Sequence, residues 1–209
     1  MLKFTTRVWL TYLMAAAHRA GLTPLSKRRF HRLVFLSNCL APLFQATPNT
    51  ARIVRYKHGP FYPLIQWELD RLATIGILTV TNIKYTHDDH GWWVNADYGV
   101  GALATSILAH CGRSSYGKQL EEYLTELVAG FASLPAATLD EVALRDENYD
   151  RPGASEDTLI DFSEQEHNLS VQTALAFRTV LPPQLIPTRK EEVFLYMRFL
   201  EALVTKKAA

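Results

Sequence analysis

The sequence of 209 residues predicts a mainly α-helical fold that contains a small β-hairpin. Apolar residues recur at helical spacing over most of the chain, and two β-rich segments flank a polar turn near its middle. Apolar residues make up 48% of the composition, which is enough to bury a sizeable core. The chain is therefore expected to fold rather than to remain disordered.

Two helices are expected at the amino terminus. Apolar residues recur at every fourth position over residues 4–20, which predicts a helix that ends at Gly21. A second helix is expected to open at Ser26, carry an apolar stripe and end near Pro42.

The first residues also raise the question of cellular location. Lys3 and Arg7 precede an apolar run over residues 8–17, an order that secretory signals share. Arg7 interrupts this run, which is too short to span a bilayer, so an amphipathic helix is favoured over a signal. The two cysteines, Cys39 and Cys111, form neither a disulfide framework nor a zinc-site spacing. We expect a cytoplasmic protein that does not cross a membrane.

A strand and a third helix are expected next. The β-branched run over residues 52–55 predicts a short strand. Gly59 and Pro60 are then expected to open a helix that Gly76 stops. The apolar positions of this helix repeat at helical intervals: Phe61, Leu64, Ile65, Leu69 and Leu72.

The hairpin completes the amino-terminal half. Residues 77–85 and 92–97 are expected to form its strands, with residues 87–91 at the tip. Helices, a strand, a helix and a hairpin follow one another in the order of a winged-helix-like module. Residues 1–97 are therefore predicted to form such a module.

The second half is predicted to be a helical region over residues 98–209. A long loop or linker is expected near residues 135–161, which contain Pro152 and Gly153. The expected helices span residues 98–111, 117–133, 166–180 and 188–205.

A net charge of +1 hides a strong segregation of charge along the chain. Residues 1–60 contain ten Lys or Arg and no Asp or Glu, so this segment carries +10. A surface that binds nucleic acid or an acidic partner is therefore expected here. The candidate residues are Lys27, Arg28, Arg29, Arg32, Arg52, Arg55 and Lys57.

The opposite charge gathers in residues 120–169. Thirteen acidic residues stand there against two arginines, a balance of −11. A docking surface for a protein partner is expected on this half, and the last helix has more apolar positions than one buried stripe needs. The candidate contacts are Glu121, Glu122, Glu126, Phe194 and Met197.

Two short motifs imitate chemical sites. Residues 112–118 place two glycines before Lys118 as a phosphate-binding loop does, but Gln119 stands where that loop needs a hydroxyl. The His87 to His90 turn combines imidazoles and carboxylates, yet adjacent residues on a tight turn rarely share one metal ion. We expect no catalytic residues, no cofactor and no metal. A small nucleotide-dependent or metal-dependent enzyme using Lys118 or the His87 turn is the competing hypothesis.

Four segments resemble a pattern found in bacterial defence proteins. The chain is similar over them to the middle components of ABC three-component systems, including the small middle subunit of Lamassu-type anti-phage complexes. A weaker similarity is to Panacea-type winged-helix antitoxins. The segments are Tyr56-Lys57-His58-Gly59-Pro60-Phe61, Leu69-Asp70-Arg71-Leu72, Gly76-Ile77-Leu78 and Asp146-Glu147-Asn148-Tyr149.

The resemblance implies a non-catalytic adaptor. Such a subunit would bridge an SMC-like ATPase and an effector, often a nuclease, in an anti-phage or anti-plasmid complex, with double-stranded DNA as a further candidate partner. The alternative is a winged-helix DNA-binding regulator or antitoxin. Acidic residues at the hairpin tip favour the adaptor, because a DNA-reading wing prefers Lys or Arg.

Overall fold

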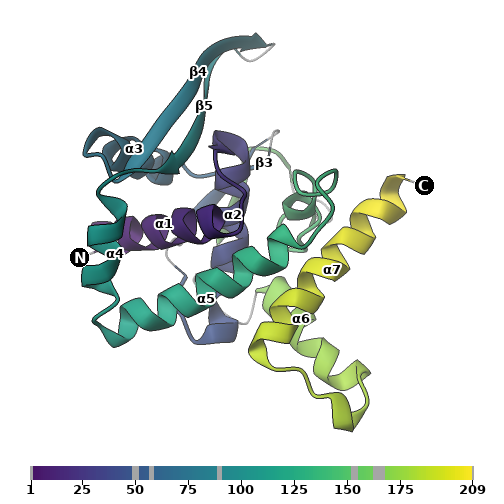
Figure 1. Cartoon of the computed structure of the whole chain (residues 1–209). Coiled ribbons are helices and arrows are strands. Elements are labelled where there is room, and N and C mark those ends of the chain that lie inside the picture. Colours follow the sequence, from purple (N-terminus) through teal and green to yellow (C-terminus); the bar gives the residue numbers. More distant parts are fainter. Residues whose placement is uncertain are drawn as a thin grey trace.

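The structure is a computed structural model that describes residues 2–48, 52–56, 59–88, 91–151, 155–161 and 168–208. It is mainly helical with small antiparallel sheets, which confirms the predicted mainly α class with a β-hairpin (Figure 1). The helices are α1 (Leu2–Arg19), α2 (Lys27–Cys39), α3 (Pro63–Thr74), α4 (Ala104–Cys111), α5 (Ser115–Ala132), α6 (Leu169–Val180) and α7 (Arg189–Ala208), with 3-10 helices η1 (Ala41–Phe44), η2 (Val142–Leu144) and η4 (Pro183–Leu185). The strands are β1 (Leu25–Ser26), β2 (Arg52–Tyr56), β3 (Gly59–Phe61), β4 (Leu78–Asp88), β5 (Gly91–Val100) and β6 (Leu159–Asp161).

Helix α1 lies inside the molecule rather than on its surface. Every residue from 8 to 17 is buried, because α5 covers α1 on one side while α3, α4 and β5 cover others. The indole Nε1 of Trp9 donates a hydrogen bond to Ser37 Oγ of α2 at 3.0 Å. Among the described residues, no helix combines the length and the apolar character that a membrane span requires.

Helix α2 begins where the sequence predicts. Ser26 is its N-cap, and the Ser26 hydroxyl accepts a hydrogen bond from the Arg29 backbone N–H at 3.2 Å. The helix ends at Cys39, and Pro42 lies in the 3-10 helix that follows.

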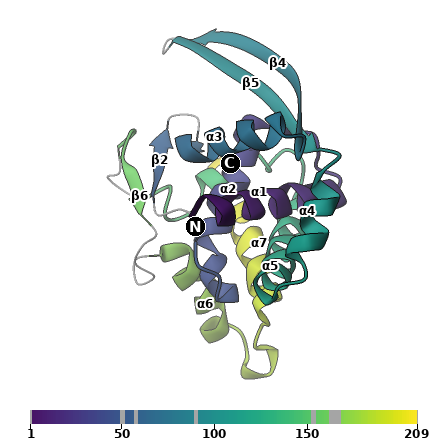
Figure 2. The ribbon, with the colours of Figure 1, turned by 90° about the vertical axis from the view of Figure 1, so that its left-hand side faces the viewer.

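The predicted hairpin is confirmed, and it is longer than expected. Strands β4 and β5 pair from Leu78 and Val100 to Asp88 and Gly91, and β1 adds to the far side of β5 to give the order β1-β5-β4. The register shifts between Thr81 and Lys84. In two perpendicular views the hairpin extends away from the helical body (Figures 1 and 2).

A second sheet, with the order β3-β2-β6, corrects the prediction that Gly59 and Pro60 open a helix. Residues 59–61 form a strand instead of opening a helix, and α3 begins at Pro63, which occupies its first turn. Gly59 has a φ of 119°, a conformation that suits an extended turn and not a helix.

The predicted linker near residues 135–161 is largely a packed segment. It contains η2, where Val142 and Ala143 are fully buried, and β6, which pairs with β2. Its backbone therefore forms part of the core and the second sheet, although residues 152–154 lie outside the described residues.

The four carboxy-terminal helices exist as predicted, with shifted ends. α4 starts at Ala104 because β5 continues to Val100. One cluster of buried apolar residues runs from Val8 to Leu200. The boundary expected at residue 97 does not separate two cores, because α1 packs against α5.

Candidate protein-binding surfaces

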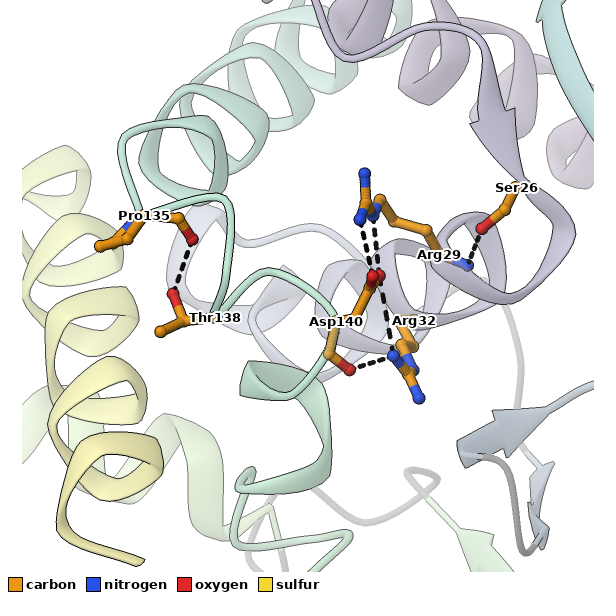
Figure 3. Close-up of polar contacts among 6 residues, drawn as sticks. All are labelled: Ser26, Arg29, Arg32, Pro135, Thr138 and Asp140. Carbon is orange, nitrogen blue, oxygen red and sulfur yellow. Dashed lines mark hydrogen bonds and ion pairs between the residues drawn. The ribbon is translucent and has the colours of Figure 1, made fainter. Parts of the chain in front are cut away.

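Two of the predicted cationic residues are engaged inside the protein. Arg29 donates from Nε and Nη2 to the two carboxylate oxygens of Asp140 at 2.8 and 2.7 Å (Figure 3). The largely buried Arg32 donates to the Asp140 backbone oxygen and lies 3.8 Å from its carboxylate. The hydrogen bond from Arg29 lowers the pKa of Asp140, and burial lowers the pKa of Arg32.

A third predicted cation, Arg55, is also internal. It is buried, donates to the Asn148 backbone oxygen at 2.9 Å and lies over the Tyr149 ring at 5.2 Å. The prediction that Arg29, Arg32 and Arg55 form a binding surface is corrected, because these side chains instead join the amino-terminal half to residues 140–149.

The remaining basic candidates have different positions. The side chain of Arg52 and the whole of Lys57 lie outside the described residues. Lys27 is half-buried, and Arg28 is exposed, with no hydrogen bond or ion pair to the described part of the chain. Both line a groove between α2 and the hairpin.

Two of the acidic candidates also meet cations of this chain. Glu121 lies 3.6 Å from Arg19, and Glu126 accepts a hydrogen bond from Lys190 at 2.7 Å. These pairs are exposed or partly exposed and contribute about 1 kcal/mol or less each. Glu122 is exposed.

An apolar groove lies between α5 and the connection from α6 to α7. It has a volume of about 610 Å³ and is lined by Glu126, Gly130, Leu185, Ile186 and Phe194, among others. Leu185 and Ile186 are 62% and 65% exposed. Exposed apolar side chains that line a concave site are typical of contacts with another molecule. We call this site the α6–α7 groove.

The two candidate contacts of the last helix have different positions. Phe194 lies in the groove and is 41% exposed. Met197 is fully buried, because the helical repeat turns it toward α5, where it lies near Gly130. The prediction of Met197 as a partner contact is corrected, and Met197 belongs to the core.

A second group of exposed apolar side chains lies at the other end of the molecule. On α3, Leu64 is 57% exposed and Trp67 is 62% exposed. On the hairpin, Tyr85 pairs with Val94 across the strands, and Trp92 is 73% exposed. We call these five residues the α3–hairpin surface. Trp67 could have been found from its spacing, since it lies opposite the helical positions that are buried.

The Asp146 to Tyr149 motif forms a buried polar cluster. The Asp146 carboxylate accepts hydrogen bonds from Ser170 Oγ, Tyr196 Oη and the Asn148 backbone N–H, at 2.8 to 2.9 Å. Burial raises the pKa of Asp146 to about 6. Asn168 completes the cluster by donating to the Cys39 backbone oxygen at 2.7 Å. The motif therefore fastens α2, α6 and α7 together.

The two motifs that imitate chemical sites have structural positions. Gly117 and Lys118 lie in the first turn of α5, and the Ser114 side chain caps that turn through the Gly117 N–H. In the His87 turn, Asp89 and His90 lie outside the described residues. Within the described ranges, no group of His, Cys, Asp and Glu could hold a metal ion.

Comparison with known proteins gives no relative, since no family model, no curated protein and no solved structure matches the chain. The features of this chain that bear on function are the two apolar surfaces, the groove beside α2 and the four motif segments.

Proposed function

We propose that the protein is a non-catalytic adaptor that binds two protein partners at once. The observation that carries this proposal is that α3 and the hairpin, which bear the α3–hairpin surface, lie at the opposite end of the molecule from the α6 to α7 connection, which lines the α6–α7 groove (Figures 1 and 2). Each site exposes large apolar side chains that a protein partner would cover. Sites so far apart can hold two partners without a clash.

The partners are proposed from the motif resemblance. An SMC-like ATPase would bind one end and an effector subunit, often a nuclease, the other, in a bacterial anti-phage or anti-plasmid complex. ATP and cleavage chemistry would belong to these partners. Asp146 of the last motif segment supports this proposal indirectly, because it holds Ser170 of α6 and Tyr196 of α7, the two helices next to the α6–α7 groove.

A winged-helix arrangement of the amino-terminal half is part of the proposal. The sheet order β1-β5-β4 supports it, as does the order α1, β1, α2, α3, β4, β5, into which η1, β2 and β3 are inserted between α2 and α3. In a DNA-reading winged helix, the helix before the wing contacts base edges. Here that helix is α3, which exposes Leu64 and Trp67, while its Arg71 is paired with Glu68 at 2.5 Å. This face suits a protein partner better than DNA.

Substitutions at the two ends test the adaptor role. With the purified products of neighbouring genes that encode an SMC-like ATPase and an effector, W67A/W92A should weaken one partner about tenfold or more and leave the other unchanged. L185S/I186S should do the reverse. Calorimetry on each pair would measure both affinities.

The exposed substitution Ser106→Ala on α4 is the matched control and should bind both partners as the wild type does. The proposal fails if neither gene product binds, or if both double variants keep both affinities. Loss of the same partner in both variants would also contradict it, because the two ends would then form one site.

The alternative is a DNA-binding winged-helix regulator or antitoxin. The exposed Arg28 beside the hairpin favours it, because this cation forms no hydrogen bond or close ion pair with the described part of the chain. Duplex DNA binding that depends on Arg28 and weakens steeply with salt would support this alternative.

A further inference from the structure

A small cavity of about 100 Å³ lies between the start of α2, strand β3 and the inner face of the hairpin. Aromatic side chains form its walls. The rings of Tyr56 and Trp93 lie 5.4 Å apart, and Phe61 lies 4.8 Å from the ring of His31. Flat apolar walls of this kind accept a planar ring by stacking.

His31, one of the residues that line the cavity, has a buried hydrogen-bond acceptor without a partner among the described residues. His31 is 4% exposed, and its Nε2 lies 3.0 Å from Gln66 Oε1. The Gln66 amide nitrogen donates to Asp70 and to Tyr98, so Gln66 Oε1 must accept, and His31 Nε2 carries the proton. His31 Nδ1 is then a lone-pair acceptor, and it has no hydrogen-bond partner within the described residues.

Burial keeps this acceptor in its neutral form. It lowers the pKa of His31 to about 4, so the imidazole is uncharged at neutral pH. An unsatisfied buried polar atom is costly, and a ligand N–H that reached it would recover a hydrogen bond.

Cations stand at the mouth of the cavity. Lys27 Nζ lies 5.7 Å from the centre of the Phe61 ring and donates to the Val94 backbone oxygen at 3.3 Å, and Arg28 is exposed beside it. An adjoining cavity of about 380 Å³ shares both cations and adds Lys84. Carboxylates also line this second cavity: Asp97, Asp140 and Glu141. Asp140 is held by Arg29, and Asp97 accepts from Asn82.

We propose that this cavity binds one unpaired nucleotide whose base carries an exocyclic amine. The base stacks against an aromatic side chain of the wall, its amine donates to His31 Nδ1, and its phosphate contacts Lys27 and Arg28. A paired base cannot enter, because its amine is already engaged and its faces are covered by neighbouring pairs. The cavity shares Val94 with the α3–hairpin surface, but His31, Lys27 and Arg28 belong to neither apolar surface. The nucleotide site therefore goes beyond the adaptor role and can fail without affecting it.

Cytosine and thymine provide the sharpest test, because cytosine has an amine where thymine has a carbonyl oxygen. Fluorescence anisotropy with labelled oligo-dC and oligo-dT of ten nucleotides should show about tenfold tighter binding of oligo-dC, the effect of one buried hydrogen bond. Calorimetry with dCMP and dTMP shows whether a free nucleotide suffices. Binding of dCMP identifies a mononucleotide ligand, and binding of oligo-dC alone identifies a strand.

Two variants examine the two halves of the site. Arg28→Ala should weaken binding of both oligonucleotides several-fold, whereas His31→Phe should remove the preference for cytosine and leave oligo-dT binding unchanged. Arg113→Ala, which removes an exposed cation from the turn between α4 and α5, is the control and should bind as the wild type does. If His31→Phe does not fold, His31→Gln can replace it, because a glutamine oxygen can accept the amine and should retain the preference.

Equal binding of oligo-dC and oligo-dT would overturn the proposal, as would unchanged binding by Arg28→Ala. Absence of binding by every nucleotide and oligonucleotide would also overturn it. Equal binding of a duplex would do so too and would favour the DNA-regulator alternative.

Discussion

Asp146 shows how burial of a single acid can set the pH response of the protein. Its carboxylate receives hydrogen bonds from Ser170, Tyr196 and the Asn148 backbone, but it has no ion pair with the described residues. Burial therefore favours its protonated form and raises its pKa from 3.8 to about 6. The folded state then holds a proton that the unfolded chain releases at lower pH.

This raised pKa predicts a stability change with a definite sign. The contribution of protonated Asp146 is fully present below pH 3.8 and is lost as the pH rises through about 6. It amounts to about 3 kcal/mol. In urea unfolding, the free energy of unfolding of Asp146→Asn relative to the wild type should increase by about 3 kcal/mol as the pH rises from about 3.5 to about 7.5.

The wild type and the variant share all other acids, so the effects of those acids cancel in the difference between the two stabilities. The pKa values of Glu68 and Asp140 are lowered by their arginine partners and act in the opposite direction, but both proteins contain them. The exposed Asp157→Asn is the control and should show no such trend. A difference for Asp146→Asn that is the same at both pH values would refute the prediction.

The sequence shows where the charged residues lie along the chain, but it does not show which of them form pairs in the fold. Composition alone shows the cations of residues 1–60 and the acids of residues 120–169. The partner of Arg32 stands 108 positions away, so no local spacing predicts that Asp140 binds it. Arg29, Arg32 and Arg55 were expected on a surface for this reason. The aromatic cavity was missed because its walls come from three separate segments.

At the level of elements, local periodicity found the structures that depend on local signals. The Ser26 cap, the Gly76 stop and the alternation around the hairpin turn each determine a boundary within a few residues. Strand β6 was missed because it has three residues and pairs with β2, about a hundred positions earlier. Strand β3 was missed because Gly-Pro is equally suited to the first turn of a helix.

The start of helix α5 depends on Gly117. A Cβ atom on Gly117 would lie 2.0 Å from the Cys111 backbone oxygen, so this glycine lets α5 start tightly against the end of α4. Gly117→Ala should reduce the free energy of unfolding by about 1–3 kcal/mol, because the two helices must move apart. Urea denaturation of the variant would measure this.

Ser115→Ala, an exposed substitution in the same turn, should leave the stability of the protein nearly unchanged. Equal stability of the two variants would mean that the Gly112 to Lys118 segment is not packed as described. The competing role of Lys118 in nucleotide binding would then need to be reconsidered.

In the whole molecule, the central position of α1 decides whether the amino-terminal half can fold without the carboxy-terminal half. Tyr123 of α5 donates a hydrogen bond to the Ser37 backbone oxygen at 2.6 Å, and its ring lies 6.0 Å from Trp9. A fragment of residues 1–97 would expose the apolar face of α1 that α5 covers. We expect this fragment to remain unfolded.

The amide NMR spectrum of the fragment should be narrow, and its unfolding by urea should show no cooperative transition. The full chain, measured under the same conditions, is the control and should give a dispersed spectrum. A dispersed spectrum for residues 1–97 alone would restore the autonomous amino-terminal module that the sequence predicts.

The covering of α1 by α5 also has a consequence for biosynthesis. The ribosome releases the amino-terminal sixty residues, with ten cations and a strongly apolar first helix, long before their counterparts exist. Helix α5 cannot cover α1 until Phe131 has left the exit tunnel. Arg29 and Arg32 can pair with Asp140 only after that residue has also emerged. Folding must therefore be completed late in translation, and the cationic, apolar nascent chain stays uncovered during the interval.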